Sequence, residues 1–387
     1  MNSQDQVEGR PPTLLGLDRI ELALLVEAAG EPNYRARQIM NAVYRERVES
    51  VEQISTLPQS LRDKLIRDGV SVGWPRIEKK FVSVDGTIRY LIAFADGQSV
   101  ETVWMPEGDG GEASVGSESG VARRWDRATI CVSSQVGCAV DCHFCLTALL
   151  GMKRNLDPGE IVGQVCAVLK DQNVSPPEDR INLVFMGMGE PFLNYDNFMK
   201  AVRLLVEGVG VAESRMTVST AGVVPRIRDF GLEKVRPRLA ISLNASNDAL
   251  RTALMPLNKK WNLDSLLAAA REFPVRNRER ITFEYVLLRG VNDSRANALE
   301  VVELLRGMRA RVNLIALNAG PGVGFETPDE GSVAAFQGIL REAGILAFVR
   351  RPRGRDIYAA CGQLKRTVEI PTLPECPPDS VLRVLGG

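Results

Sequence analysis

The alternation of apolar and polar positions divides the chain into three parts with different secondary structure. Between residues 13 and 75, apolar residues recur three and four positions apart, which is typical of amphipathic helices, and Gly30 ends the first of them. Pro58 stands in the first turn of a third helix, where proline is favoured. We therefore expect a small helical accessory domain, which either only packs against the rest of the chain or contacts RNA or DNA. A nucleic-acid contact would use four arginines, Arg35, Arg37, Arg45 and Arg47.

Residues 76–126 form the second part, a short β linker. Apolar and polar side chains alternate there, and two Asp-Gly pairs, Asp85-Gly86 and Asp96-Gly97, interrupt the alternation. Asp-Gly between alternating runs is a strong sign of a hairpin turn, so we expect a small antiparallel meander. The stretch 108–122 contains five glycines, three serines and no aromatic residue, which predicts a flexible insert.

The third part, residues 127–366, alternates short apolar runs with amphipathic stretches, and flexible tails are expected outside these parts at 1–12 and 367–387. Candidate strands are 128–134, 181–187, 215–221, 238–244, 281–288, 312–318 and 345–351. Helices are expected between most of them, for example at 158–171, 195–208 and 294–308. The alternation indicates βαβ units in an α/β fold, and about six repeats fit a partial (β/α)6 barrel with its active site at the carboxyl ends of the strands. A doubly wound open sheet is the alternative.

Composition excludes several classes of protein without changing this fold. The 387 residues are 45% hydrophobic and 25% charged, as in ordinary globular proteins. No apolar run reaches the length of about 18 residues that a transmembrane helix needs, and the polar N-terminus lacks a signal core, so we expect a cytoplasmic protein without membrane contact. The 48 basic and 48 acidic residues exclude a uniformly basic nucleic-acid binder, although a local basic patch stays compatible with zero net charge.

The scarcity of histidine restricts the chemistry further. The only histidine is His143, so an HExxH zinc site is excluded, and a Ser-His-Asp triad would have to use this residue. Catalysis must therefore rely on cysteine, carboxylates or a cofactor. Seven cysteines, an odd number in a chain without an export signal, favour cofactor or catalytic roles over a disulfide framework.

Four of the seven cysteines follow the first strand of the third part. Cys131 comes first, and Cys138, Cys142 and Cys145 then form a C-x3-C-x2-C triplet. A triplet after the first βα strand is typical of radical S-adenosylmethionine enzymes, because three cysteines on a 4Fe–4S cluster leave one iron open to the amino and carboxylate groups of that cofactor. The alternative is a structural zinc site that includes His143. Its spacing is poor, since structural zinc ligands usually come as two separated pairs.

Glycines and polar residues follow the later strands, where the carboxyl ends should meet at one rim. They are Gly187, Gly189 and Glu190 after the second strand, Ser219 at the third, Ser242, Leu243 and Asn244 at the fourth, and Asn318 at the sixth. Glycine lets a backbone approach a ligand closely, and a glutamate can accept a hydrogen bond from an ammonium group. Each of these residues alone is as common in a cap or a turn, so it is their gathering that predicts a ligand site.

Cys361 lies near the C-terminus, between small residues that would leave its sulfur accessible. It follows a run of four arginines, Arg350, Arg351, Arg353 and Arg355. Nearby arginine would lower the pKa of the thiol and make it a nucleophile. The alternatives are that Cys361 is a buried small apolar residue and that the arginine run is a solvated loop. Cys166 occupies an apolar helical position and is expected to be structural, and Cys376 lies in a proline-rich tail without an expected role.

Together these motifs resemble the RlmN/Cfr family of radical S-adenosylmethionine RNA adenine methyltransferases, from about residue 14 to residue 366. The resemblance rests on the cysteine triplet, GEPNYRARQI at 30–39, GMGEP at 187–191, STAGVVP at 219–225, Ser242-Leu243, Asn318 and ACGQL at 360–364. The chain departs from the usual pattern at Leu146 after the triplet, at Asn244, and in its longer insert.

The resemblance implies an activity and three catalytic residues. A methyl group would be added to C2 of adenine 2503 in 23S rRNA, and for some members to adenine 37 of tRNA. Cys361 would carry the methyl group, Glu101 in Ser99-Val-Glu-Thr-Val-Trp would be the base, and Cys131 would form a transient disulfide with Cys361. The resemblance also implies two S-adenosylmethionine molecules per turnover, a 4Fe–4S cluster on Cys138, Cys142 and Cys145, an electron donor such as flavodoxin or ferredoxin, and a monomer.

Three other functions stay open at this point. A relative that methylates C8 of the same adenine shares nearly all these residues. A metal-stabilised RNA-binding protein without chemistry would need no pair of Cys131 and Cys361. A radical enzyme that modifies a protein would leave the arginine run unexplained.

Overall fold

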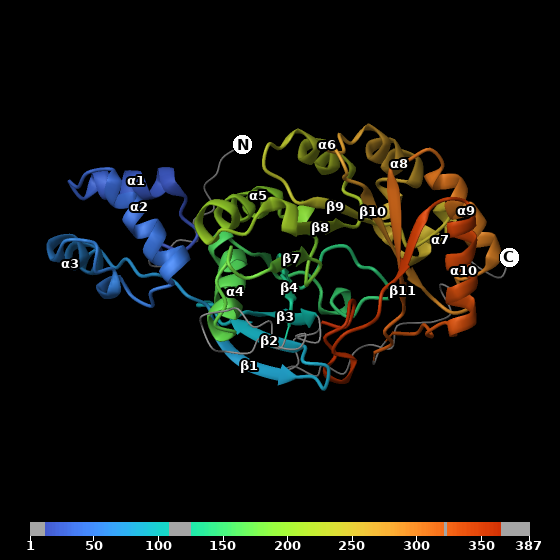
Figure 1. The fold of residues 1–387 in the computed structure, drawn as a ribbon, viewed down its shortest axis with the longest axis horizontal. Coiled ribbons are helices and arrows are strands. Elements are labelled where there is room, and N and C mark those ends of the chain that lie inside the picture. The colour runs from blue at the N-terminus through green and yellow to red at the C-terminus, as the bar shows by residue number, and fades with distance from the viewer. Residues whose placement is uncertain (1–11, 108–124, 321–322, 365–387) are drawn as a thin grey trace.

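The computed structural model describes residues 12–107, 125–320 and 323–364. The insert expected at 108–122 and Cys376 lie outside the described residues, as do the expected tails except Pro12. A helical region, shown in blue in Figure 1, lies to one side of a large curved sheet that is covered by helices. No helix within the described ranges is both long and apolar enough to cross a membrane.

The helical region has the three helices expected between residues 13 and 75. They are α1 (Arg19–Ala28), α2 (Tyr34–Asn41), continued by a π-helical turn η1 (Ala42–Glu46), a short 3-10 turn η2 (Val51–Gln53), and α3 (Gln59–Arg67). α1 begins at a capping box, in which Asp18 accepts hydrogen bonds from the amides of Ile20 and Glu21 while the Glu21 carboxylate accepts from the Asp18 amide.

One ten-stranded sheet contains both the expected meander and the expected barrel strands. Its strands are β1 (Arg76–Val82), β2 (Ile88–Ala93), β3 (Ser99–Glu107), β4 (Arg127–Cys131), β7 (Ile181–Phe185), β8 (Met216–Thr220), β9 (Arg238–Ser242), β10 (Ile281–Leu287), β11 (Ala310–Ala316) and β12 (Leu346–Val349). The strands from β1 to β4 are antiparallel, and those from β4 to β12 are parallel. The meander is therefore the first edge of the main sheet and not a separate linker sheet.

The order of the strands distinguishes the partial barrel from the doubly wound alternative. Neighbours in the sheet follow one another in chain order from β1 to β12, with no reversal. A doubly wound sheet reverses its strand order at a switch point, whereas barrels are wound in one direction. The partial (β/α)6 barrel is thus confirmed, with β12 as a further parallel strand at its edge.

Helices follow the parallel strands and cover the outer face of the sheet (Figure 1). They are α4 (Pro158–Asp171), α5 (Tyr195–Leu204) with its π-helical end η5 (Leu205–Val209), α6 (Val224–Leu232), α7 (Asp248–Leu254), α8 (Leu263–Glu272), α9 (Arg295–Leu305) and α10 (Glu330–Glu342). Short 3-10 turns connect them, namely η3 (Ala148–Leu150), η4 (Pro191–Leu193), η6 (Glu213–Arg215), η7 (Pro256–Lys259) and η8 (Arg355–Ile357). Several strands end earlier than expected, since the chain leaves the sheet into the loops that carry the rim residues.

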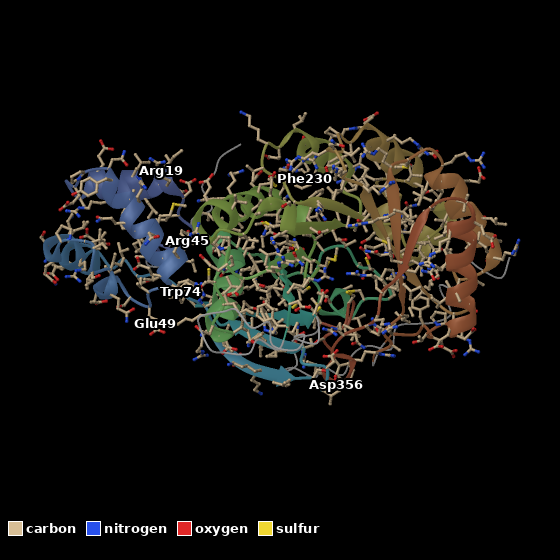
Figure 2. The ribbon with its side chains drawn as sticks, in the orientation of Figure 1. Arg19, Arg45, Glu49, Trp74, Phe230 and Asp356 are labelled. Atoms are coloured by element: carbon tan, nitrogen blue, oxygen red, sulfur yellow. The ribbon has the colours of Figure 1, made fainter. Side chains whose placement is uncertain are left out.

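The helical region packs directly on the barrel. The buried Tyr44 hydroxyl accepts from the Gly16 amide and donates to the Leu17 carbonyl, and its ring fills the space beside Gly208 of η5. Figure 2 shows Trp74 and Arg45 at this junction, where Trp74 donates to the Val48 carbonyl. One continuous apolar core spans both parts, so the helical region is packed on the barrel through this face.

The four arginines considered for nucleic-acid contact differ in their availability. Arg47 donates to the Val174 carbonyl and the Ser175 hydroxyl, and Arg35 forms an ion pair with Glu31. Arg37 and Arg45 are exposed. Of these four arginines, only Arg37 and Arg45 are exposed enough to contact a nucleic acid.

Candidate functional site

The cysteine triplet lies in a closed loop beyond the carboxyl end of β4. Two short strands, β5 (Gln135–Val136) and β6 (Arg154–Asn155), pair antiparallel and close the neck of this loop. Gly137 has a φ of +82°, and a Cβ atom there would lie 1.8 Å from the Gly151 carbonyl oxygen. Only glycine permits such an approach, so the neck brings the two ends of the loop into backbone contact.

The three cysteines are half-buried against a small apolar cluster that includes Val140, Phe144, Leu250 and Leu254. Burial raises the pKa of Cys138 to about 12 and that of Cys142 well above its ordinary value. A thiol that ionises so reluctantly would need a positive centre to become a thiolate.

The three cysteines occupy one loop but do not converge on one point. Among residues 12–107, 125–320 and 323–364, no three Cys, His, Asp or Glu side chains converge as a single metal ion requires. The His143 amide donates to the Leu254 carbonyl, and its buried Nδ1 atom has no hydrogen-bond partner among the described residues. Three thiols on one loop match the donor set of a 4Fe–4S cluster, which binds each thiolate at a different iron.

The glycines after β7 are packed against the chain that leads into the cluster loop. A Cβ atom on Gly187 would lie 2.7 Å from the Ser133 hydroxyl, and one on Gly189 would lie 2.5 Å from Cβ of Gln135. Gly189 also has a φ of +97°, a conformation that disfavours every other residue. The two glycines thus let the turn after β7 and the segment after β4 form one wall of the rim.

Glu190 is buried at this wall and is bound by backbone amides. Its carboxylate accepts from the amides of Phe192 at 3.0 Å and Ala221 at 2.6 Å, which joins the turn after β7 to the end of β8. Burial raises the pKa of Glu190 to about 7 in spite of these bonds. Two carboxylate oxygens can accept about four hydrogen bonds, so capacity for an ammonium donor remains. Such a cation would favour the ionised carboxylate.

Ser219, Ser242 and Asn318 make few hydrogen bonds to the rest of the described chain. The hydroxyl oxygens of Ser219 and Ser242, at the ends of neighbouring strands β8 and β9, lie 3.3 Å apart. Asn318 is buried in the loop after β11, and its side chain makes no hydrogen bond to the described part of the chain. These three side chains keep capacity for an external partner.

Leu243 and Asn244 are bonded within the protein instead. The Leu243 amide donates to the Glu284 carbonyl, and its carbonyl accepts from Arg251. The Asn244 side chain accepts from the Val286 amide at 2.9 Å and donates to the Met255 sulfur, and its φ of +57° suits asparagine. A ligand contact at either residue would have to share these bonds.

Arg251 is a residue of this site that the sequence interpretation missed. It is completely buried on α7, and it donates to the carbonyls of Ala221, Ser242 and Leu243. It therefore ties the chain after β8 to the chain after β9. The signal for it was its position between Leu250 and Leu254, within the apolar face of its helix.

The segment that carries Cys361 is attached to the chain that follows the cluster triplet. The Leu146 amide donates to the Gly362 carbonyl at 2.8 Å, and the buried Thr147 hydroxyl donates to the Leu364 carbonyl at 2.7 Å. The Gln363 side chain donates to the Ala319 carbonyl, next to Asn318. Cys361 itself is exposed.

The acidity of Cys361 is opposite to the sequence expectation. Crowding by protein atoms and the nearby Glu284 carboxylate raise its pKa to about 11, and Arg350 offsets only a part of this. The expected lowering by the arginine run is thus wrong, because burial of the thiol outweighs one neighbouring charge. Arg353 is also unavailable, since it donates to the Pro106 carbonyl. Arg350, Arg351 and Arg355 remain exposed.

Cys131 lies at the end of β4, buried and within electrostatic reach of Cys361. Burial raises the pKa of Cys131 above its ordinary range, and the Cys361 thiol raises it further. The other buried cysteine, Cys166 on α4, has a pKa raised to about 12 by burial and packs in the main core, as expected for a structural residue. The fold thus brings the triplet, Cys131 and Cys361 to one end of the barrel.

Glu101 lies on β3 beside this group, and its partner is Arg89. Val103 pairs with Cys131 across β3 and β4, so Glu101, two residues earlier, faces the same side of the sheet as Cys131. Its side chain is fully buried and forms a 2.5 Å ion pair with Arg89, whose side chain is 3% exposed. Arg89 stacks on Phe81 with its guanidinium carbon 4.2 Å from the ring centre. The interpretation of Glu101 as a solvent-facing strand residue is therefore wrong.

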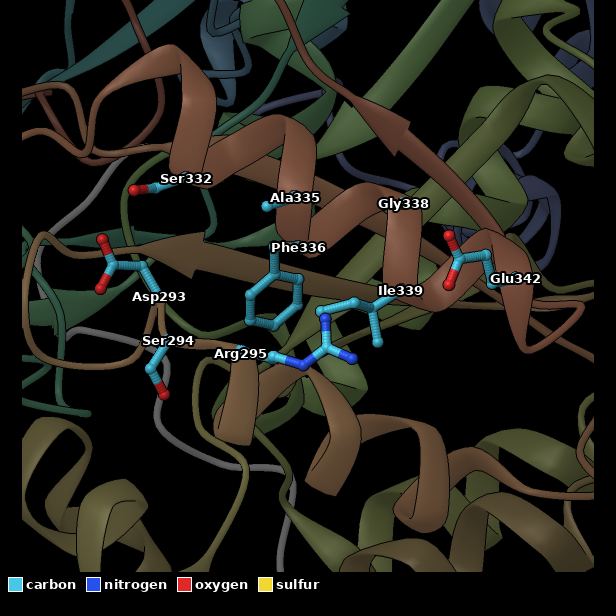
Figure 3. Close-up of a pocket in the computed structure, with 9 residues that line it drawn as sticks. All are labelled: Asp293, Ser294, Arg295, Ser332, Ala335, Phe336, Gly338, Ile339 and Glu342. Atoms are coloured by element: carbon cyan, nitrogen blue, oxygen red, sulfur yellow. The ribbon is translucent and has the colours of Figure 1, made fainter.

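The pocket in Figure 3 does not belong to this site. It lies between α9 and α10 on the outer side of the barrel and is lined by Asp293, Ser294, Arg295, Ser332, Ala335, Phe336, Gly338, Ile339 and Glu342. None of the expected site residues lines it.

Two families match different parts of the chain. Residues 132–302, from the end of β4 to α9, match the Radical SAM superfamily. Residues 13–69, the helical region, match the Ribosomal RNA large subunit methyltransferase N-terminal domain. The two matches correspond to the barrel and to the region packed beside it.

Curated relatives and a solved structure extend over nearly the whole chain. The chain is 66% identical over 348 residues to "Probable dual-specificity RNA methyltransferase RlmN" of Koribacter versatilis, covering 90% of this chain and 100% of the relative. It is 43% identical over 336 residues to "Dual-specificity RNA methyltransferase RlmN" of Nitratiruptor sp., covering 86% and 93%. The crystal structure of a radical SAM methyltransferase from Sphaerobacter thermophilus is similar with a TM-score of 0.82 and 42% identity, covering 92% of this chain and 99% of that one.

Proposed function

The chain belongs to the RlmN family of radical SAM dual-specificity RNA methyltransferases, and on this premise we propose how its own residues transfer a methyl group to C2 of an adenine in RNA. The family's chemistry uses S-adenosylmethionine and a 4Fe–4S cluster. We propose that Cys138, Cys142 and Cys145 hold the cluster, because they share one closed loop and supply three thiols, one for each of three irons. When bound, the cluster supplies the electron that cleaves S-adenosylmethionine to a 5′-deoxyadenosyl radical.

Residues at the carboxyl ends of β7, β8, β9 and β11 bind S-adenosylmethionine in this proposal. Glu190 accepts from the amino group, which its remaining hydrogen-bonding capacity supports, and Gly189 allows the ligand close to the backbone. Ser219, Ser242 and Asn318 provide further polar contacts. Leu243 and Asn244 contribute mainly by keeping this part of the rim in shape through the bonds they already make.

Cys361 is the proposed carrier of the methyl group. Its sulfur would attack the methyl group of a first S-adenosylmethionine, which leaves as S-adenosylhomocysteine. The thiol proton must be lost, and the raised pKa of Cys361 makes this the demanding part of the step. The radical that a second bound S-adenosylmethionine would supply would take one hydrogen atom from the methyl group on Cys361, and this carbon would then bond to the adenine ring. Two molecules of the cofactor are therefore used for each methyl group.

Glu101 and Cys131 complete the reaction. Glu101 would take the proton from the adenine carbon, and the unpaired electron left by the addition would return to the bound cluster. The ion pair with Arg89 holds the Glu101 carboxylate in place for this step. The Cys131 thiolate would then attack the Cys361 sulfur, so that an S–S bond forms as the S–C bond breaks, and the released carbon takes a proton to become the methyl group. A thiol or dithiol reductant would return the transient disulfide to two thiols. The electrostatic coupling between the two thiols supports this pairing.

The RNA substrates proposed are 23S rRNA at adenine 2503 and tRNA at adenine 37. Because base carbon atoms are inaccessible in a stacked helix, the adenine must be splayed out to reach the barrel. Arg37 and Arg45 on the helical region and Arg350, Arg351 and Arg355 beside Cys361 are exposed and would contact phosphates. We further propose a cytoplasmic monomer that receives its electron from a flavodoxin or a ferredoxin.

The observation that carries the proposal is the attachment of residues 362–364 to residues 146–147. It holds Cys361 beside the cysteine loop although the two are far apart in the sequence. A protein that used the metal only for stability would have no need of this contact or of Cys131.

Anaerobic turnover with methyl-labelled S-adenosylmethionine and a 23S rRNA fragment tests the proposal. Wild type should transfer label to C2, and Cys361→Ala should transfer none, while Cys166→Ala serves as a control that changes a packed cysteine. Mass spectrometry of the adenine separates C2 from C8, and a C8 product would identify the chain with the C8-methylating relative. Methyl transfer by Cys361→Ala would refute the role of Cys361.

A further inference from the structure

Arg251 is a buried cation whose hydrogen-bond acceptors carry no charge. None of its atoms is exposed, and its acceptors are the carbonyls of Ala221, Ser242 and Leu243 and the Asn258 amide oxygen. Its side-chain hydrogen bonds to the described residues all end on uncharged oxygens and none on a carboxylate. A buried charge without a charged partner is costly, so such groups usually neutralise or face an opposite charge that is not a hydrogen-bond partner.

The helix that carries Arg251 is in direct contact with the cysteine loop. The Leu254 carbonyl at the end of α7 accepts from the His143 amide at 3.0 Å. Leu250 and Leu254, the neighbours of Arg251 on α7, pack in the apolar cluster that also contacts the three cysteines. The Arg251 side chain reaches Ala221 of the same cluster at 2.6 Å. The guanidinium is therefore placed on the barrel side of the loop.

The electrostatics of the two groups agree with this placement. The Arg251 guanidinium lies within electrostatic reach of the Cys142 sulfur, and Asp248 is the acidic side chain that also acts on it.

We propose that Arg251 is a positioning residue that raises the reduction potential of the metal cluster held by Cys138, Cys142 and Cys145. This inference rests on the cluster assignment of the proposed function. One-electron reduction adds a negative charge to the cluster, and a fixed cation in a poorly solvated place stabilises the reduced form more than the oxidised form. The hydrogen bonds to three carbonyls hold the guanidinium in place, so it cannot move away when the charge changes.

The alternative is that Arg251 only clamps the chain after β8 to the chain after β9. The two roles respond differently to substitution. Arg251→Lys keeps the charge but loses the fork of donors, whereas Arg251→Gln removes the charge and keeps a polar side chain. A clamp would be damaged by both changes, but the potential should follow only the charge.

A second variant changes the same field without touching the arginine. Asp248 begins α7, and its carboxylate partly offsets the charge of Arg251. Asp248→Asn keeps the acceptor for the Leu263 amide and removes the negative charge. Asp229→Asn is the matched control, because Asp229 lies on the outer helix α6 in an exposed pair with Arg226.

The measurement is an anaerobic dithionite titration with redox mediators, in which electron paramagnetic resonance follows the reduced cluster without S-adenosylmethionine. Iron and sulfide content is measured first. Protein without iron and sulfide would overturn the cluster assignment itself, whereas loaded protein tests Arg251 alone.

The expected midpoint potential is more negative than wild type in Arg251→Gln, close to wild type in Arg251→Lys and Asp229→Asn, and more positive in Asp248→Asn. If Arg251→Gln does not fold, Asp248→Asn decides. An unchanged or more negative midpoint in Asp248→Asn, or equal midpoints in Arg251→Gln and wild type, would overturn the inference.

Discussion

Replacement of Glu101 by glutamine should affect both the stability of the barrel and its chemistry. The change keeps the shape of the side chain but leaves Arg89, which is 3% exposed, without its charged partner in the 2.5 Å ion pair. Breaking a buried pair by removing one partner typically costs about 3–5 kcal/mol of unfolding free energy. That is a large part of the roughly 5–15 kcal/mol that stabilises a domain, so a loss of activity in Glu101→Gln alone would be ambiguous.

The double variant Arg89→Met/Glu101→Gln resolves the ambiguity. The double variant removes the uncompensated buried charge of Arg89 as well, so it should regain a large part of the lost stability, less the cost of a buried glutamine amide. It should not regain turnover, because a general base contributes roughly 10²–10⁴-fold to a rate, or about 3–5 kcal/mol in the barrier. Thermal unfolding of the wild type, both single variants and the double variant measures the first quantity.

The chemical readout is the fate of the RNA after anaerobic turnover with labelled S-adenosylmethionine. Both variants that lack Glu101 should still methylate Cys361 and should accumulate RNA bound covalently to the protein, seen as a shifted band that carries the label. Free methylated RNA formed at the wild-type rate by the stable double variant would show that Glu101 is not the base. An adduct in Arg89→Met alone, with Glu101 intact, would show instead that the base needs its arginine.

Three further predictions follow from contacts around the cysteines. Gly137→Ala should lose bound iron and sulfide, because the new methyl group would stand 1.8 Å from the Gly151 carbonyl oxygen. The control Gly30→Ala has a similar φ of +79° and nothing within 4 Å, so it should lose only the roughly 1–2 kcal/mol of stability that a left-handed alanine costs. Equal iron content in the two variants would contradict this prediction. Thr147→Val should leave the buried Leu364 carbonyl without its 2.7 Å donor, which should lower the local stability of the Cys361 segment by about 1–3 kcal/mol. Amide hydrogen exchange of residues 361–364 should then become faster, while exchange in the core should not change. The pKa of Glu190 is raised to about 7 in the folded protein, so the folded state tolerates the protonated carboxyl better than the ionised one. Glu190 should therefore lower the free energy of unfolding of the metal-free protein by about 3 kcal/mol as the pH rises from 4.5 through 7. Glu190→Gln should flatten this part of the pH profile, and an unchanged slope would refute the raised pKa of Glu190.

Local pattern predicted the sheet and the cysteine loop because both depend on neighbouring residues. α4 begins at Pro158 and ends at Asp171 as expected, since Asp157 and Glu160 form a capping box around that proline. The Asp-Gly pairs mark the two hairpin turns, where Gly86 and Gly97 have positive φ values. The spacing of the triplet likewise determines that its members share one loop.

What the sequence did not predict depends on partners distant along the chain. Nothing near Glu101 announces that Arg89 will neutralise it, because the two meet only when β2 and β3 pair. The pKa of Cys361 was misjudged for the same reason, since neighbours in sequence are arginines but neighbours in space include Glu284. Arg251 was passed over because one charged residue in a short helix is ordinarily exposed.

The contact between residues 146–147 and residues 362–364 has a consequence for how the protein is made. The strands pair in chain order, so during synthesis each new strand finds its partner already in place. The Cys361 segment is attached only after the last of them, beyond β12. The contact between residues 146–147 and residues 362–364 is therefore the last part of this end of the barrel to form, because it needs residues that are synthesised after every strand of the sheet.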